Sequence, residues 1–367
     1  TKVVLLGSPH VYYSLCEYDK DFSTLFKVAA DFDDQIERTD DTISEYVKVI
    51  NNVIKRDQLS PFHCSAVARI IEHSSRLVED SEKLAAHMGD LIDIIRETDY
   101  WAKQREHTIV EAVDVQKAID QQIFRTNRLH TEIKESILRN TVLIRTEDHQ
   151  VGQINGLSVI ELGNFVFGQP SRITATARLG DGKVLDIEHE SELGGEIHAK
   201  AVLILSHYLS SHYVKHRPLS LSASIVFEQS YSDVEGDSAS IPALCALLSA
   251  IGNLPVKQSI AVTGSVDQYG QVQVVGAVNE KIEGFFDICQ ARGLSGKQGV
   301  IIPRANEPHL MLRQDIIAAA KQNLFHIYTA NTIDEVMELL TDLPAGSRND
   351  NDCFPEQTLN HQIEAQL

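Results

Sequence analysis

The sequence contains no run of 18 apolar residues, so it predicts neither a transmembrane helix nor a membrane partner. It also lacks an N-terminal apolar segment followed by a small-residue cleavage site, the pattern of a secretory signal. The five cysteines form no C-x-x-C pair, which favours a reducing compartment and a cytoplasmic location. Basic residues are scarce: 33 Lys and Arg face 52 Asp and Glu, for a net charge of −19. That charge repels phosphate backbones, so we expect no nucleic-acid partner.

The chain also lacks a starting methionine, although residues 3–7 have the apolar character of a core strand. We therefore expect the chain to begin inside a larger protein or a processed form. A length of 367 residues exceeds one ordinary core, so at least two domains are expected.

The rest of the chain divides into two regions with different sequence patterns. Residues 31–140 have helical periodicity, and their last helix, 111–139, is expected to break near Thr126. Residues 150–345 mix strand-like and helical segments, which predicts an α+β protein. Within them, residues 172–178 and 184–188 flank a glycine-rich turn and predict a hairpin. The polar residues 346–367 predict a disordered tail.

The chemistry centres on Ser238 and on Lys281, which lies 43 residues further along the chain. Ser238 follows a Gly-Asp pair and precedes an apolar helical run, whose free N–H groups can hold a developing oxyanion. A serine hydroxyl needs a base, and a buried lysine serves if its amine is uncharged. Apolar residues follow Lys281 at helical spacing and predict such burial: Ile282, Phe285, Phe286 and Cys289.

These signals also fit ordinary structure. The Gly-Asp-Ser segment fits a helix cap, with Ser240 as an alternative N-cap, and Lys281 fits a solvated surface lysine. A nucleophile elbow would need glycine at Ser240, and no lysine stands three residues after Ser238. His207, His212 and His216 form a loose cluster without an evident third ligand. An exposed helix surface is the favoured interpretation, and no metal site is predicted.

Several ordered motifs resemble the Lon protease family, in its archaeal-type B branch. Residues 234–240 resemble the family's catalytic-serine motif and residues 276–283 its catalytic-lysine motif, at the family's separation. The resemblance also covers residues 262–264, 195–200 and 301–306, and it extends over about 150–345. It implies a Lon-type protease domain there, with Ser238 as nucleophile and Lys281 as general base. It places Thr263 beside Lys281 as a hydrogen-bond partner. It also places Glu235 and Asp237 next to the serine, where they gate or perturb the dyad.

The helical half resembles the lid of the same family's AAA+ ATPase, through residues 25–33, 65–72 and 96–102. The resemblance implies that residues 1–30 end a truncated ATPase core and that residues 31–140 are lid-like. No G-x-x-x-x-G-K-[ST] phosphate loop occurs, since residues 293–298 have the wrong spacing. His87 stands near the position of the family's nucleotide-sensing arginine. We therefore expect no cofactor and no ATP hydrolysis in this chain; ATP and Mg²⁺ would require a longer protein.

The expected function is a serine endopeptidase that degrades unfolded or extended polypeptides. The resemblance implies a homohexamer. The alternative is a non-proteolytic hexameric scaffold, or a client-binding module, with a silent dyad. A nucleotide-driven remodeller is a third interpretation, which the missing phosphate loop disfavours.

Overall fold

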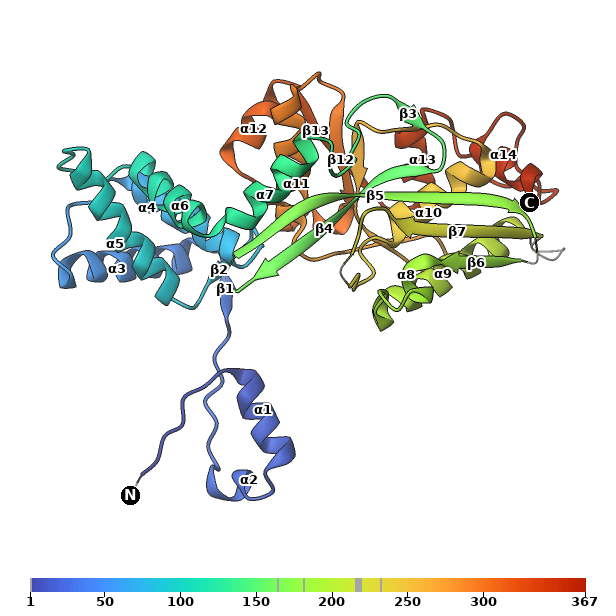
Figure 1. The fold of residues 1–367 in the computed structure, drawn as a ribbon. Helices are drawn as coiled ribbons and strands as arrows, with labels where there is room; N and C mark the ends of the chain where they lie inside the picture. The colour runs from blue at the N-terminus through green and yellow to red at the C-terminus, as the bar shows by residue number, and fades with distance from the viewer. Residues whose placement is uncertain (1, 164, 181, 215–219, 232) are drawn as a thin grey trace.

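The computed structural model describes residues 2–163, 165–180, 182–214, 220–231 and 233–367. A helical domain lies at one end, a larger α/β domain at the other, and an N-terminal segment extends away from both (Figure 1). That segment holds α1 (Pro9–Tyr18) and α2 (Phe22–Leu25). The core strand predicted over residues 3–7 is wrong, because this stretch is exposed and unpaired within the described chain. A strand needs a neighbouring strand for its N–H and C=O groups, and none is supplied here.

The helical domain packs four helices around one apolar cluster. A two-stranded antiparallel sheet adjoins them, β1 (Gln35–Glu37) against β2 (Lys83–Ala85). Thr39 caps the first helix by accepting the Thr42 N–H. The four helices are α3 (Asp40–Arg56), α4 (Cys64–Leu77), α5 (Gly89–Gln104) and α6 (Ala112–Thr126). The predicted break occurs at Asn127, after which α7 (Arg128–Leu138) packs against the α/β domain instead.

The α/β domain is built on a seven-stranded mixed sheet of order β13-β12-β9-β4-β5-β7-β6. Its first four strands are parallel neighbours, whereas β5 is antiparallel to both β4 and β7. The strands are β4 (Gln153–Leu162), β5 (Phe165–Leu179), β6 (Lys183–Asp186), β7 (Leu221–Phe227), β9 (Ile260–Val262), β12 (Gln298–Pro303) and β13 (Phe325–Ala330). The shorter strands are β3 (His149–Gln150), β8 (Val256–Lys257), β10 (Ser265–Val266) and β11 (Val272–Gln273).

The predicted hairpin over 172–188 is wrong. Strand β7 lies between β5 and β6, and β6 runs parallel to β7. The glycine-rich turn therefore connects two strands that do not pair, and its Asp181 lies outside the described residues.

Strand alternation divides the core between the two faces of the sheet. On β12, Ile301 packs into one cluster while Val300 and Ile302 pack into another, because successive side chains point to opposite faces. The first cluster contains α10 (Ser240–Gly252), and the second contains α11 (Val278–Arg292). The remaining helices are α8 (Ile187–Glu190), α9 (Glu196–Tyr213), η1 (Arg304–His309), α12 (Gln314–Lys321), α13 (Ile333–Thr341) and α14 (Leu359–Gln366).

The prediction of a disordered tail is wrong for its last part. Helix α14 packs against α10, and Phe354, Leu359 and Ile363 are buried in the same cluster. The Tyr213 hydroxyl donates to Asn360 Oδ1 at 2.7 Å. The polar composition of residues 346–367 concealed three apolar side chains: Phe354 lies in the loop before α14, and Leu359 and Ile363 lie four positions apart on α14. Within the described residues, no helix combines the length and apolarity needed to cross a bilayer.

Candidate active site

Ser238 lies in a bent segment two residues before α10. The bend needs Gly236, which adopts a φ of +94°, a conformation that side chains with a Cβ rarely accept. The Ser238 carbonyl accepts hydrogen bonds from the Gly264 N–H at 2.9 Å and from Thr263 Oγ1 at 3.2 Å. These two bonds hold the serine backbone against the end of β9, so the position of Ser238 depends on the sheet.

Lys281 lies in the first turn of α11 and is 3% exposed. Its helix carries the apolar face that the sequence predicts, since Ile282, Phe285 and Phe286 are all buried. Burial lowers the pKa of the Lys281 ammonium from 10.5 to about 8, because desolvation disfavours the charged form. The Asp237, Glu79 and Glu280 carboxylates act in the opposite direction. The amine is therefore poised to titrate near neutral pH.

Two glycines allow α11 to approach the sheet closely enough to place Lys281. A Cβ on Gly168 of β5 would lie 2.0 Å from the Glu280 carbonyl oxygen and 2.7 Å from Lys281 Cα. A Cβ on Gly284 would lie 2.1 Å from the Gly168 carbonyl oxygen. Any larger residue at either position would push the lysine helix away from β5.

The structure brings only some of the expected residues to Lys281. Asp237 is close enough to act on the lysine charge, and its Oδ2 accepts a hydrogen bond from Ser265 Oγ at 2.8 Å. Glu235 instead accepts the Ile197 N–H at 3.2 Å, at the start of α9. Thus one of the two carboxylates of the serine segment faces the lysine, and the other anchors a neighbouring helix.

Thr263 is buried, and its hydroxyl donates to the Ser238 carbonyl rather than to the lysine. In this conformation Thr263 forms no hydrogen bond with Lys281, and its role as a partner of the lysine stays a prediction. Among the described residues, Lys281 Nζ makes no hydrogen bond with Ser238 Oγ or with any other atom. Direct proton transfer from the serine hydroxyl therefore requires the two side chains to come into hydrogen-bond geometry first.

The sequence did not indicate the carboxylate that the helical domain supplies. Glu79 follows α4, and its Oε2 accepts the N–H of Ala277 at 3.1 Å, just before the lysine helix. Ala277 itself adopts a left-handed conformation with a φ of 52°. Burial and the neighbouring Glu280 raise the pKa of Glu79. No local pattern predicts this contact, because it joins residues 198 positions apart.

Arg76, at the end of α4, joins the same two domains. Its Nη2 lies 2.5 Å from Glu280 Oε1 and 3.1 Å from Glu283 Oε2, and its Nη1 donates to the Met311 carbonyl at 2.9 Å. Burial raises the pKa of Glu283 to about 7, although Arg76 opposes that change. The helical domain is therefore attached by charged groups to the helix that carries Lys281.

Three family models match successive parts of the chain. A LonB-like AAA domain matches residues 1–33, and the AAA+ ATPase LID domain of archaeal LonB matches residues 61–125. The C-terminal proteolytic domain of Lon protease (S16) matches residues 139–342, more than half of the 367 residues.

Curated relatives show the same similarity over most of the chain. A protein described as a Lon protease homolog from Escherichia coli is 37% identical over 345 residues, which are 93% of this chain and 58% of the relative. A second such homolog, from Haemophilus influenzae, is 46% identical over 237 residues, 64% of this chain and 39% of the relative. An archaeal Lon protease from Thermococcus kodakarensis is 29% identical over 307 residues, 82% of this chain and 45% of the relative.

This chain therefore spans about half the length of the curated relatives that it matches. The matched segments follow the order of the described domains, with the helical domain before the sheet that carries Ser238 and Lys281. This order is the lid-plus-protease architecture of LonB proteins, and the chain belongs to the Lon protease family.

Proposed function

We propose that this chain is a serine endopeptidase in which Ser238 is the nucleophile and Lys281 is the general base. The observation that carries the proposal is the burial of Lys281, which lowers its pKa to about 8 beside the serine segment. An amine with that pKa is partly uncharged at neutral pH and can accept a proton from a hydroxyl. No histidine is needed for this step.

In the proposed reaction, Lys281 Nζ takes the Ser238 hydroxyl proton while Oγ attacks the substrate carbonyl carbon. The resulting ammonium then gives that proton to the leaving amine as the peptide bond breaks, which leaves an acyl group on Ser238 Oγ. Water, activated by the same amine, releases the acyl group and restores the hydroxyl. Each step returns the lysine to the state that the next step requires.

The backbone hydrogen bonds around Ser238 exclude some N–H groups as donors to the oxyanion. The N–H of Ser240 already donates to the Asp237 carbonyl, and the N–H of Ile241 donates to the Gly264 carbonyl. Within the part of the chain that the structure describes, the N–H groups of Ser238 and Ala239 have no acceptor. We assign them as the donors that stabilise the tetrahedral intermediate.

The remaining parts of the proposal extend to the whole assembly. We propose a homohexamer that acts on unfolded or extended polypeptides, supported by membership of the Lon family. We also propose that this chain does not hydrolyse ATP, because its sequence contains no phosphate loop. The cysteines are free thiols, which supports a cytoplasmic location. Light scattering tests the homohexamer, and an ATPase assay on the same preparation tests the absence of ATP hydrolysis.

The decisive test of the dyad is labelling by an acylating inhibitor, read by intact mass, together with hydrolysis of casein. We expect one adduct per wild-type chain, on Ser238, and no adduct with Ser238→Ala. Lys281→Met should lose both labelling and hydrolysis, whereas Lys321→Met, at an exposed lysine, should keep both. Hexamers without labelling or hydrolysis would overturn the proposal and favour a scaffold with a silent dyad.

A further inference from the structure

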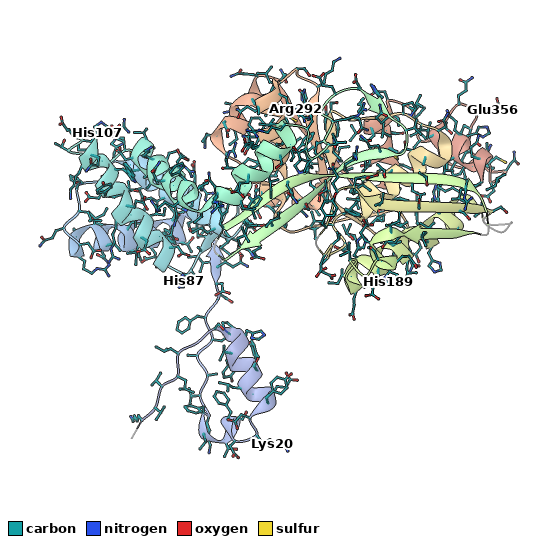
Figure 2. All side chains as sticks on the ribbon, viewed as in Figure 1. Lys20, His87, His107, His189, Arg292 and Glu356 are labelled. Atoms are coloured by element: carbon teal, nitrogen blue, oxygen red, sulfur yellow. The ribbon has the colours of Figure 1, made fainter. Side chains whose placement is uncertain are left out.

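A second cluster of ionisable groups lies at the edge of the sheet, apart from Lys281. Asp186 ends β6, Glu188 lies in α8, and His198 lies in the first turn of α9. All three are buried, with exposed fractions of 6%, 4% and 4%. One ligand atom from each residue lies within 4.8 Å of the others. The neighbouring His189, also on α8, is exposed on the outside of the molecule (Figure 2).

The polar atoms of this cluster are poorly satisfied by the described residues. Both carboxylate oxygens of Asp186, Glu188 Oε2 and His198 Nε2 are buried without a hydrogen-bond partner. His198 Nε2 lies 3.1 Å from Asp186 Oδ2 without the geometry of a hydrogen bond. Only Glu188 Oε1 is used, as the acceptor of the Phe227 N–H at 2.8 Å. Burying such groups without compensation costs about 1–3 kcal/mol each, so a proton, a water molecule or a cation is expected between them.

We propose that Asp186, Glu188 and His198 bind a zinc ion. One imidazole nitrogen and two carboxylate oxygens form a mixed donor set that suits Zn²⁺, which is usually four-coordinate. Tetrahedral bonds of about 2.0–2.2 Å place ligand atoms roughly 3.4 Å apart, so small side-chain rotations complete the site. A water molecule would supply the fourth ligand. The three ligands differ from the histidines that the sequence pattern singles out, His207, His212 and His216, the last of which lies outside the described residues.

The ion would stabilise the start of α9, which is hydrogen-bonded to the chain segment that leads to Ser238. The N–H of Gly195, just before α9, donates to the Val234 carbonyl at 3.0 Å, and the Val234 N–H donates to the Leu193 carbonyl at 2.8 Å. Glu235 accepts the Ile197 N–H one residue before His198. The same turn of α9 therefore holds both the proposed ligand and the chain that leads to Ser238. The proposed role is structural, and the first readout is stability.

The competing explanation is a proton shared by the two carboxylates. Burial raises the pKa of Glu188, and the neighbouring Asp186 raises it further. A shared proton would satisfy Oδ2 or Oε2 without any metal. The two explanations differ in metal content and in the response to added Zn²⁺.

The test uses the 367-residue chain, with metal content measured by mass spectrometry after dialysis. We expect about one zinc per chain, a lower melting temperature after chelation, and recovery when Zn²⁺ is returned. Glu188→Gln keeps the acceptor for the Phe227 N–H but loses a charge, so it should fold and bind Zn²⁺ at least about 10-fold more weakly, since a direct ligand counts for no less than an outer-shell partner. His198→Gln should weaken binding similarly. His207→Gln, at an exposed histidine of the same helix, should bind like wild type.

The proposal is overturned if wild-type protein contains no zinc and added Zn²⁺ leaves its melting temperature unchanged. It is also overturned if Glu188→Gln and His198→Gln bind Zn²⁺ as tightly as wild type, because the ion would then lie elsewhere. Neither measurement depends on peptidase activity, so the result stands apart from the proposed dyad.

Discussion

Asp237→Asn should raise peptide hydrolysis at neutral pH. Burial lowers the pKa of Lys281 to about 8, and the Asp237 carboxylate is the foremost charge that opposes this decrease. Asparagine has nearly the same size and keeps a side-chain oxygen to accept the Ser265 hydroxyl, so the substitution removes the charge with little change in packing. Without that charge the ammonium is less favoured, and the pKa of Lys281 should decrease further.

The size of the effect is limited by the fraction of amine that is already uncharged. With a pKa of about 8, roughly one lysine in ten is neutral at pH 7, and about one in a hundred at pH 6. The gain in kcat/KM therefore cannot exceed about tenfold at pH 7 or about 100-fold at pH 6. Above about pH 9 the amine is mostly neutral in both proteins, and their rates should converge.

The assay is hydrolysis of a fluorogenic peptide between pH 6 and 9.5, with kcat/KM plotted as the ratio of variant to wild type. Asp233→Asn is the matched control, because Asp233 is exposed in the same segment and does not act on Lys281. A ratio that falls steadily towards one as pH rises supports the reasoning. A ratio that is the same at every pH would refute it, since the carboxylate would then act on something other than the lysine proton.

Three further predictions concern stability. Lys281→Met should be more stable than wild type at pH 7, and that advantage should shrink by about 2 kcal/mol by pH 9.5. Between pH 7 and 9.5 the lysine of the unfolded chain keeps its proton while the buried lysine loses it, so wild-type stability rises with pH. Urea unfolding at both pH values measures the difference in free energy of unfolding between Lys281→Met and wild type. A difference that stays constant contradicts the burial argument. Gly168→Ala should cost about 3 kcal/mol through its clash with the lysine helix, whereas Gly276→Ala meets open space and should unfold in urea like wild type. Arg76→Met should cost about 2 kcal/mol, less than a fully buried pair, because Arg76 is 22% exposed. Adding Glu283→Gln should restore part of that loss; no recovery in the double variant would show that the two residues are not coupled.

Local patterns in the sequence predicted many of the elements correctly. The apolar spacing after Lys281 predicted a buried helix face, and those residues are buried in α11. The break near Thr126 was also predicted, and it falls between α6 and α7. These features depend on contacts within a few residues, which periodicity reports directly. The order of strands does not depend on such local contacts. The predicted hairpin is wrong for this reason, because β7 lies between its two strands in the sheet.

In the candidate site, too, the sequence predicted the residues that lie in local motifs and missed those that come from distant parts of the chain. Motifs in the sequence pointed to Ser238, Lys281 and Asp237, but two contributions came from distant parts of the chain. Glu79 reaches the lysine helix from the helical domain, and Gly168 lets that helix lie against β5. Neither residue has a neighbour in sequence that marks it.

The sequence by itself determined which residue types were available, their order, and the apolar faces of their helices and strands. Only the tertiary structure decided the depth at which Lys281 is buried and which carboxylates surround it. It also decided that Asp186, Glu188 and His198 lie together without hydrogen-bond partners for most of their polar atoms. The physical reason is that desolvation and charge interactions depend on distance in space, and chain folding sets those distances between residues far apart in sequence.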